Sequence, residues 1–341
     1  MSARLQVERL YVELPTRAGW VRPVNDVSFA LDEGEAIGVV GESGSGKTML
    51  ALALMGLMPH GARRTGHAFL QRQHSNGDGI KSTGAADLIT DGPERIRKLR
   101  GGEISMIFQE PMTALNPMIR IGEQIAESIR VHEPPQSSAE VRRQVISALE
   151  RASVPEPERR ARQYPHQLSG GLRQRVMIAM ALAPGPGVLI ADEPTTALDV
   201  TVQKQILDLL AKLRRELRLS LLFISHDLGV VSQIADRVAV MYAGRIIEEG
   251  PVNEVLHHPR HPYTEGLLRA APRLKREKPA PIPGSVPSLD ALPPGCAFAP
   301  RCALHIAECD KAMPELISVK LNSGREADDA HRARCILVKR E

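Results

Sequence analysis

The run GESGSGKT at residues 41–48 has the residue types and spacing needed to hold a chain of phosphates. Its glycines allow backbone N–H groups to turn inward, and a helix that follows would add the positive end of its dipole. Lys47 can place a charge on the β and γ phosphates, and the hydroxyl of Thr48 can ligate Mg²⁺. The candidate nucleotide-binding residues are therefore Gly41, Ser43, Gly44, Ser45, Gly46, Lys47 and Thr48.

A pair of acids, Asp192 and Glu193, follows the apolar run at residues 188–191. Beside a phosphate loop, we expect Asp192 to hold Mg²⁺, directly or through water, and Glu193 to polarise the attacking water. Gln109 and His226 also follow apolar runs, and the carboxyl ends of parallel strands are where ligands gather. A lone histidine is more often structural, so His226 carries both interpretations at this stage.

The segment LSGG at residues 168–171 precedes a helical run. Ser169, Gly170 and Gly171 are small and offer N–H donors, which is what an anion site at a helix N-terminus needs. Asp199 follows shortly after the acidic pair and is a further candidate.

Strand and helix patterns surround these residues in a regular order. Buried-strand patterns occupy residues 36–40, 104–108, 188–191, 221–225 and 238–241. Helical stretches separate most of them, which predicts a mostly parallel sheet with covering helices.

Three other stretches break this alternation. Residues 4–34 alternate polar and apolar side chains and predict antiparallel strands, whereas the polar stretch at 71–92 is expected to be an exposed loop. Residues 121–162 read as charged helices interrupted by prolines and predict a helical insertion.

Composition bounds the class of protein. The chain has 341 residues, is 43% hydrophobic and carries a formal net charge of +4. The near balance of charge and the 3% aromatic content give no argument for a nucleic-acid partner. We see no apolar run long enough to span a bilayer and no signal-peptide pattern, so we expect a cytosolic chain without disulfides.

The motifs taken in order resemble those of an ATP-binding-cassette (ABC) ATPase: residues 41–48, Gln109, 168–171, 192–193, 197–199 and 225–227. The resemblance implies an α/β fold of the P-loop NTPase (RecA-like) kind, with an N-terminal antiparallel β subdomain and an inserted helical subdomain at about 111–185. It also implies a nucleotide-binding domain at 1–260 and an irregular extension at 261–341.

In that family two cassettes close head to tail on ATP. By resemblance, Ser169 and Gly171 act on the γ-phosphate bound by a partner chain, and Asp199 lies near the shared interface. His226 would contact the γ-phosphate, while Gln109 would sense Mg²⁺ and water and report to the membrane partner. An aromatic residue before the phosphate loop usually stacks on adenine; Trp20 is a candidate for that role or for a surface packing role.

Two further segments resemble one branch of the family, the importers for peptides and nickel. These are residues 108–117 (FQEPMTALNP) and 261–264 (HPYT). Of the neighbouring histidines, His257 and His258 are interpreted as loop residues and His261 as part of this segment, so none is a predicted metal ligand.

All four cysteines lie near the C-terminus, and their spacing is not the one usual for zinc. Similar members of the family carry a [4Fe–4S] cluster, so a cluster is the first interpretation, with zinc or free thiols as alternatives. The predicted ligands are Cys296, Cys302, Cys309 and Cys335.

The sequence therefore predicts the ATP-hydrolysing subunit of a bacterial importer of di- or oligopeptides, at the cytoplasmic face of the cell membrane. Its expected partners are a related second ATPase chain, two permease subunits and, indirectly, an external solute-binding protein. Alternatives are the same role for another solute such as nickel or glutathione, an exporter subunit, or a soluble cassette protein acting on ribosomes or DNA.

Overall fold

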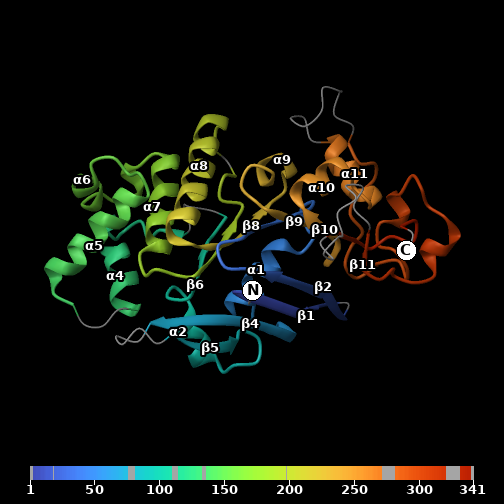
Figure 1. Ribbon diagram of the computed structural model, residues 1–341, viewed down its shortest axis with the longest axis horizontal. Coiled ribbons are helices and arrows are strands. Elements are labelled where there is room, and N and C mark those ends of the chain that lie inside the picture. Colours follow the sequence, from blue (N-terminus) through green and yellow to red (C-terminus); the bar gives the residue numbers. More distant parts are fainter. Residues whose placement is uncertain are drawn as a thin grey trace.

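Two sheets form the framework of the protein (Figure 1). The computed structural model describes residues 3–17, 19–75, 81–109, 114–132, 136–196, 198–270, 281–319 and 331–338. Within these ranges, one sheet has the strand order β2-β1-β4-β5 and the other the order β11-β12-β10-β9-β3-β8-β7-β6.

The centre of the larger sheet is parallel, as the apolar runs predict. Each strand pairs in parallel with its neighbour from β9 through β3, β8 and β7 to β6. Nearly all residues of these strands are buried, because helices or the second sheet cover both faces. The bounds are β3 (Ala36–Val40), β6 (Ile104–Ile107), β7 (Val188–Asp192), β8 (Ser220–Ser225) and β9 (Arg237–Tyr242).

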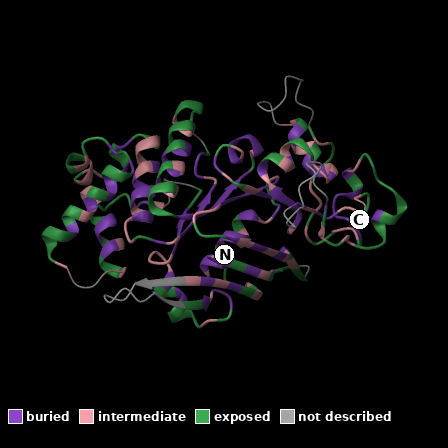
Figure 2. Ribbon diagram, viewed as in Figure 1, coloured by how far each residue is buried: buried purple, intermediate pink, exposed green. Residues whose placement is uncertain are grey.

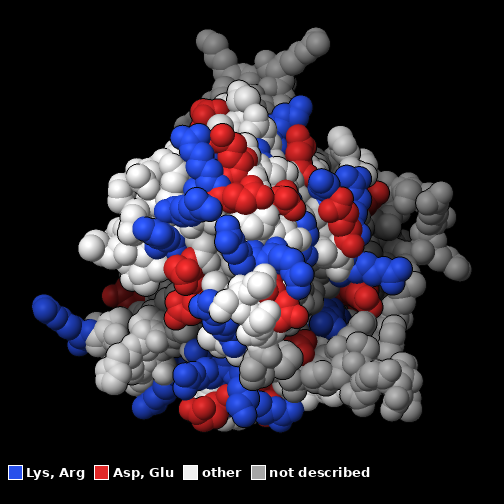
Figure 3. Space-filling model, turned by 90° about the vertical axis from the view of Figure 1, so that its left-hand side faces the viewer, with Lys and Arg blue, Asp and Glu red and all other residues white. Residues whose placement is uncertain are grey.

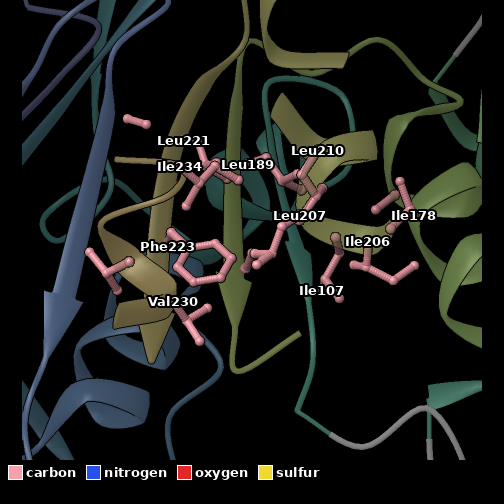
Figure 4. Packing of buried hydrophobic residues seen from close by; sticks show 14 of the residues in the cluster. Ile107, Ile178, Leu189, Ile206, Leu207, Leu210, Leu221, Phe223, Val230 and Ile234 are labelled. Atoms are coloured by element: carbon pink, nitrogen blue, oxygen red, sulfur yellow. The ribbon is translucent and has the colours of Figure 1, made fainter. Parts of the chain in front are cut away.

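Side chains of these strands alternate between two hydrophobic cores. Leu221 and Phe223 of β8 pack in the core on the helical side, whereas Leu222 and Ile224 pack in the core shared with the antiparallel sheet. Figure 4 shows the first core, where Leu221 and Phe223 face Leu207 and other apolar residues. Because the period of a strand is two residues, one continuous apolar run fills both layers.

The antiparallel sheet confirms the strands predicted for residues 4–34 and corrects the prediction for 71–92. Residues predicted to form a loop belong to the β4–β5 pair, in which Phe69 pairs with Asp87 and Ser75 with Lys81; residues 76–80 lie outside the described ranges. Ladder hydrogen bonds come from the backbone, so a polar edge pair can form without an apolar pattern. The strands are β1 (Leu5–Thr16), β2 (Gly19–Leu31), β4 (Arg63–Ser75) and β5 (Lys81–Asp87).

Helices surround the larger sheet, with exposed residues along their outer sides (Figure 2). The helices predicted around Pro134 and Pro155 are present, and α4 to α7 gather at the end of the molecule opposite the C-terminus (Figure 1). None of the described helices is long and apolar enough to cross a membrane. The bounds are α1 (Lys47–Met55), α2 (Pro93–Leu99), α4 (Ile121–His132), α5 (Ser138–Arg151), α6 (Pro157–Ala161), η1 (Pro165–Gln167), α7 (Gly170–Leu182), α8 (Val200–Leu217) and α9 (Leu228–Val231).

The C-terminal region is joined to the larger sheet and is not a separate appendage. Its short strand β12 (Arg332–Ala333) pairs with β10 (Arg245–Pro251), and β11 (Ile317–Ser318) pairs with β12. The remaining elements are α10 (Val252–His257), α11 (Pro262–Ala270), η2 (Ala299–Arg301) and η3 (Ala307–Asp310).

Candidate functional site

The loop at residues 41–48 joins β3 to α1 and approaches other backbone segments too closely for side chains at its glycines. Gly46 has a φ of 104°, and a Cβ there would lie 1.9 Å from the carbonyl oxygen of Pro23. A Cβ on Gly41 would lie 2.2 Å from the carbonyl oxygen of Met241. The neighbouring β-hairpin and β9 therefore fix the path of the loop, and glycine is required at both positions.

Lys47 is held in place by the loop itself. Its Nζ donates to the carbonyl oxygens of Gly41, at 2.7 Å, and Glu42, at 3.0 Å, and the residue is only 5% exposed. Burial lowers the pKa of Lys47, while nearby Glu193 and Asp192 oppose that effect. A buried ammonium near the start of a helix is a strong electrostatic site for an anion.

Asp192 ends β7 beside Thr48, the second residue of α1. The hydroxyl of Thr48 donates to Oδ1 of Asp192 at 3.4 Å, and Asp192 is 1% exposed. Burial raises the pKa of Asp192, an effect that the Thr48 hydrogen bond partly offsets. One carboxylate and one hydroxyl are oxygen donors that suit Mg²⁺, which usually keeps several waters and phosphate oxygens among its ligands.

Glu193 collects three neighbours on a single oxygen. Its Oε2 accepts from Nε2 of Gln109 at 3.3 Å and from the hydroxyl of Thr196 at 2.8 Å, and Nδ1 of His226 lies 3.3 Å from it. All three contacts involve Oε2, and among the described residues no hydrogen bond to Oε1 of Glu193 is seen. The carboxylate is thus oriented through one oxygen, which leaves the other for a water molecule.

Sheet topology explains why these residues meet. Asp192 ends β7, and Lys47, Gln109 and His226 come after β3, β6 and β8. These four parallel strands are consecutive in the sheet, in the order β3-β8-β7-β6. Sequence reasoning found all of them but missed Thr196. Its position three residues after Glu193, in the turn that leaves β7, was the available signal.

Ser169 stands apart from this group. It is the N-cap residue of α7, but its side chain accepts no capping hydrogen bond, and both Ser169 and Gly170 are exposed. Gly171 packs against α8, where a Cβ would lie 2.8 Å from a methyl carbon of Val202. The segment therefore presents a free hydroxyl and the first N–H groups of a helix toward the surface.

Asp199 has a defined local role, as the N-cap of α8. Its Oδ1 accepts from the backbone N–H groups of Thr201, at 3.0 Å, and Val202, at 2.9 Å. This cap accounts for the position of the residue at the start of the helix.

Trp20 lies at the start of β2 and is 46% exposed. The guanidinium carbon of Arg63 is 4.1 Å from the centroid of its ring, which is a cation–π contact. The contact favours the packing interpretation, because Arg63 occupies one face of the only indole.

The four cysteines are free thiols, of which Cys296 and Cys309 are buried. Burial raises the pKa of Cys296, Cys302 and Cys335, and other cysteines of the set, including Cys309, raise each of them further. The backbone N–H of Cys296 also donates to the carbonyl of Cys309 at 2.8 Å. In the part of the chain that the structure describes, however, no three His, Cys, Asp or Glu residues are placed closely enough to hold a metal ion.

Comparison with family models gives two matches. Residues 24–196 match the ABC transporter family, and residues 247–309 match the C-terminal region of oligopeptide and dipeptide transporters.

Related proteins give the same picture. The chain is 49% identical over 340 residues to proteins of Brucella ovis and Brucella abortus named as peptide import ATP-binding proteins, covering 97% of this chain and 96% of each relative. Among solved structures, the dimeric bacterial ABC transporter cassette MJ0796 superimposes with a TM-score of 0.61 at 26% identity, covering 73% of this chain and 98% of that one. A second structure of MJ0796, in a post-hydrolysis state with ADP and phosphate, gives the same TM-score at 27% identity and the same coverage.

Proposed function

Because the chain belongs to the ABC transporter family of ATPases, we propose that it energises the import of di- or oligopeptides across a bacterial membrane. The observation that carries the choice of solute is the C-terminal match to oligopeptide and dipeptide transporters at residues 247–309. The relatives named as peptide import ATP-binding proteins support it over nearly the whole chain.

The geometry supports a proposed sequence of steps in hydrolysis. The loop N–H groups and Lys47 bind the phosphates of ATP, and Thr48 with Asp192 would hold Mg²⁺, which when bound neutralises phosphate charge. Glu193 accepts a proton from water through its available oxygen as the water oxygen bonds to the γ-phosphorus. The bond from that phosphorus to the β–γ bridging oxygen breaks, and ADP and phosphate leave.

His226 and Gln109 support this step from the other oxygen of Glu193. Both lie 3.3 Å from Oε2, and the two side chains come from the ends of β8 and β6, the strands on either side of β7. We assign His226 to the γ-phosphate contact and Gln109 to sensing Mg²⁺ and water. Gln109 directly precedes residues 110–113, which lie outside the described ranges, so the route from it to a permease stays a prediction.

A second ATPase chain completes the site in this proposal. The exposed N-terminus of α7 supports it, because Ser169 and Gly171 are available to the phosphates of a partner and Asp199 lies nearby on α8. We propose a related but different chain as that partner. Trp20 is retained as a candidate adenine contact only through the ring face opposite Arg63.

Two permease subunits would dock at the end of the molecule formed by α4 to α7. A hollow of about 440 Å³ lies there between α4, α5 and α6, and Met118, two residues before the lining residue Arg120, is 82% exposed. Arg120, Glu123 and Arg162 are among its lining residues. Figure 3 shows basic and acidic side chains interspersed over this face, which suits a protein partner better than a nucleic acid. Docking there would place the chain at the cytoplasmic face of the membrane.

We further propose that Cys296, Cys302, Cys309 and Cys335 hold a [4Fe–4S] cluster. The support is that burial, together with other cysteines of the set, raises the pKa values of Cys296, Cys302 and Cys335, since iron would stabilise the thiolates. An anaerobic preparation should contain iron and labile sulfide. A preparation without iron and without labile sulfide would exclude the cluster and leave zinc or free thiols as the alternatives.

The proposed domains are a nucleotide-binding domain at 1–260, which contains a helical subdomain at about 111–185, and an extension at 261–341. The ladder between β12 and β10 supports an extension that folds against the first domain. Replacing Cys302 with Ser should then weaken stability or assembly and leave nucleotide affinity largely intact.

Uptake of labelled peptides by a strain lacking this chain tests the solute. We expect uptake to fall on deletion and to return with the wild-type chain but not with the Lys47→Ala variant. If deletion instead reduces the uptake of nickel or glutathione and leaves the uptake of peptides unchanged, the result would support the alternative solutes. Copurification with permease subunits separates the importer from a soluble cassette protein.

A further inference from the structure

Arg301 of the C-terminal region contacts the phosphate loop directly. Arg301 forms a two-pronged ion pair with Glu42, with N–O distances of 2.7 and 3.0 Å. The Arg301 side chain is 4% exposed and that of Glu42 is 31% exposed. Two separate N–H···O bonds fix the plane and position of a carboxylate, which a single contact cannot do.

Arg301 has further partners besides Glu42. Its Nε donates to the carbonyl of Pro283 at 2.8 Å, and Nη1, which also donates to Glu42, donates to the hydroxyl of Tyr242 at 3.3 Å. These contacts come from β9 and from the segment after residue 280, so the guanidinium is preorganised before it meets Glu42.

Tyr263 makes a second contact with the same loop residue. Its hydroxyl accepts from the backbone N–H of Glu42 at 2.8 Å, and the residue is fully buried. Its ring packs against Tyr242, with centroids 4.6 Å apart, and against Phe298, with centroids 5.4 Å apart. The backbone and the side chain of Glu42 are therefore both held by residues of a packed aromatic cluster.

Glu42 needs this restraint because of where it lies. It is the only acidic residue in the run at 41–48, next to the place where a highly anionic ligand binds. Its charge acts on Lys47, and Lys47 also bonds to its carbonyl oxygen. A carboxylate left without its arginine could turn toward Lys47 and would repel phosphate.

We propose that Arg301 and Tyr263 are positioning residues of the nucleotide site, which neutralise and restrain Glu42 so that the phosphate loop and Lys47 are available to ATP. The inference rests on the proposed ATP binding at the 41–48 loop and adds the C-terminal region to that site. It concerns affinity for nucleotide and is independent of which solute is transported.

The sign of the expected effects separates this idea from a general packing role. Arg301→Gln leaves Glu42 charged and unpaired, so the full-length chain should bind MgATP about 10-fold more weakly, with KM raised and kcat changed little. Removing the charge as well, in Glu42→Gln/Arg301→Gln, should restore most of that affinity. Arg301→Lys keeps the charge without the fork and should fall between the wild type and Arg301→Gln.

The matched control is Arg332→Gln, which removes another arginine–glutamate pair of the C-terminal region, with Glu249 on β10. It should leave ATP affinity unchanged, and thermal unfolding checks that every variant is folded. A folded Arg301→Gln chain with wild-type affinity would overturn the proposal, as would a double variant that binds no better than the single one. If Arg301→Gln does not fold, ATP binding by the Glu42→Gln variant provides the test. The proposed repulsion predicts that this variant binds ATP at least as tightly as the wild type, so weaker binding would contradict it.

These measurements also keep the two proposals apart. Failure of the wild-type chain to bind MgATP would refute the proposed nucleotide site itself. Normal binding by the wild type with no effect at Arg301 would refute only the positioning role.

Discussion

Two regions of the molecule carry the predicted chemistry, and they differ in how far one chain completes them. At the strand ends, each functional side chain already has partners in its own chain: Lys47 is held by loop carbonyls, Asp192 by Thr48, and Glu193 by Gln109, Thr196 and His226. At the start of α7, the hydroxyl of Ser169 caps nothing and is exposed.

The difference teaches where assembly must act. In the proposed function, the strand edge binds nucleotide and orients water by itself, because Lys47 and Asp192 are buried and the side chains have hydrogen-bond partners before a ligand arrives. An exposed helix N-terminus with a free hydroxyl becomes useful only when an anion is brought to it. Breaking the first region should therefore stop the chemical step, and breaking the second should stop only what depends on a partner.

The largest effect is expected from Glu193→Gln. The amide keeps the shape of the side chain but cannot take a proton from water, so ATP turnover should fall about 1,000-fold while ATP still binds. Phosphate release and equilibrium binding measure the two quantities. Glu216→Gln, at an exposed position of α8, is the control and should match the wild type. Turnover near the unmutated rate would remove Glu193 from its role.

A somewhat smaller loss is expected from Ser169→Arg in the second region. The position is exposed, so the large side chain should not disturb the fold, but it would block approach of a partner's phosphates. We expect turnover in the assembled transporter to fall about 100-fold, with ATP affinity of the isolated chain unchanged. Ser285→Arg replaces another exposed serine and serves as the control.

Mixing the two defective chains sharpens the comparison. In a dimer of identical chains, a mixed pair would contain one site with intact Glu193 and intact Ser169, and some activity would return. Since we propose a different partner chain, we expect mixing to restore nothing. Recovery of activity would instead establish that this chain pairs with itself.

Sequence reasoning was most successful where the polarity pattern and the topology agree. Apolar runs predicted the parallel strands, and parallel strands place Lys47, Gln109, Asp192 and His226 at one edge whatever the details of the loops. Local patterns were sufficient because each residue lies at the end of its strand or in the short segment that follows it.

Contacts between distant segments were beyond such patterns. Arg301 meets Glu42 across 259 positions of the chain, and the β12 ladder joins Glu248 to Ala333. The β4–β5 pair was missed for a different reason, since residues 71–75 and 81–84 are polar or glycine and show no apolar pattern, whereas ladder hydrogen bonds come from the backbone. Neither kind of contact has a periodic signature in the sequence.

Acid should lower the free energy of unfolding through His261, a buried residue of the C-terminal region. His261 is buried beside Glu248, and burial lowers its pKa from 6.5 to about 4. Between pH 6.5 and pH 4 the unfolded chain therefore binds more protons at this histidine than the folded chain does. The stability that neutral His261 contributes is fully present above pH 6.5 and is lost as the pH falls toward 4. Between pH 7 and pH 5 the loss from this group is about 2 kcal/mol.

Replacing His261 with Asn tests that origin, because the Asn oxygen can still accept from the backbone N–H of Tyr263, as Nδ1 of His261 does at 3.0 Å. Urea unfolding at both pH values should show the difference between them shrink by about 2 kcal/mol in the variant. His258→Asn, an exposed neighbour, should retain the wild-type pH dependence. An unchanged slope in His261→Asn would assign the acid sensitivity to other groups.

Asp199 gives the smallest effect and bears most directly on the second region. Its carboxylate caps α8, which packs through Val202 against Gly171, so Asp199→Ala should lower the free energy of unfolding by about 1 kcal/mol. Asp199→Asn keeps an oxygen for the cap and should unfold like the wild type. If the interface position predicted by family resemblance also matters, Asp199→Asn will still reduce turnover in the assembled transporter, because the charge is gone while the helix is intact. Normal turnover in Asp199→Asn would leave the cap as the whole role of this residue, and the second region would then depend on Ser169 and the N–H groups of α7 alone.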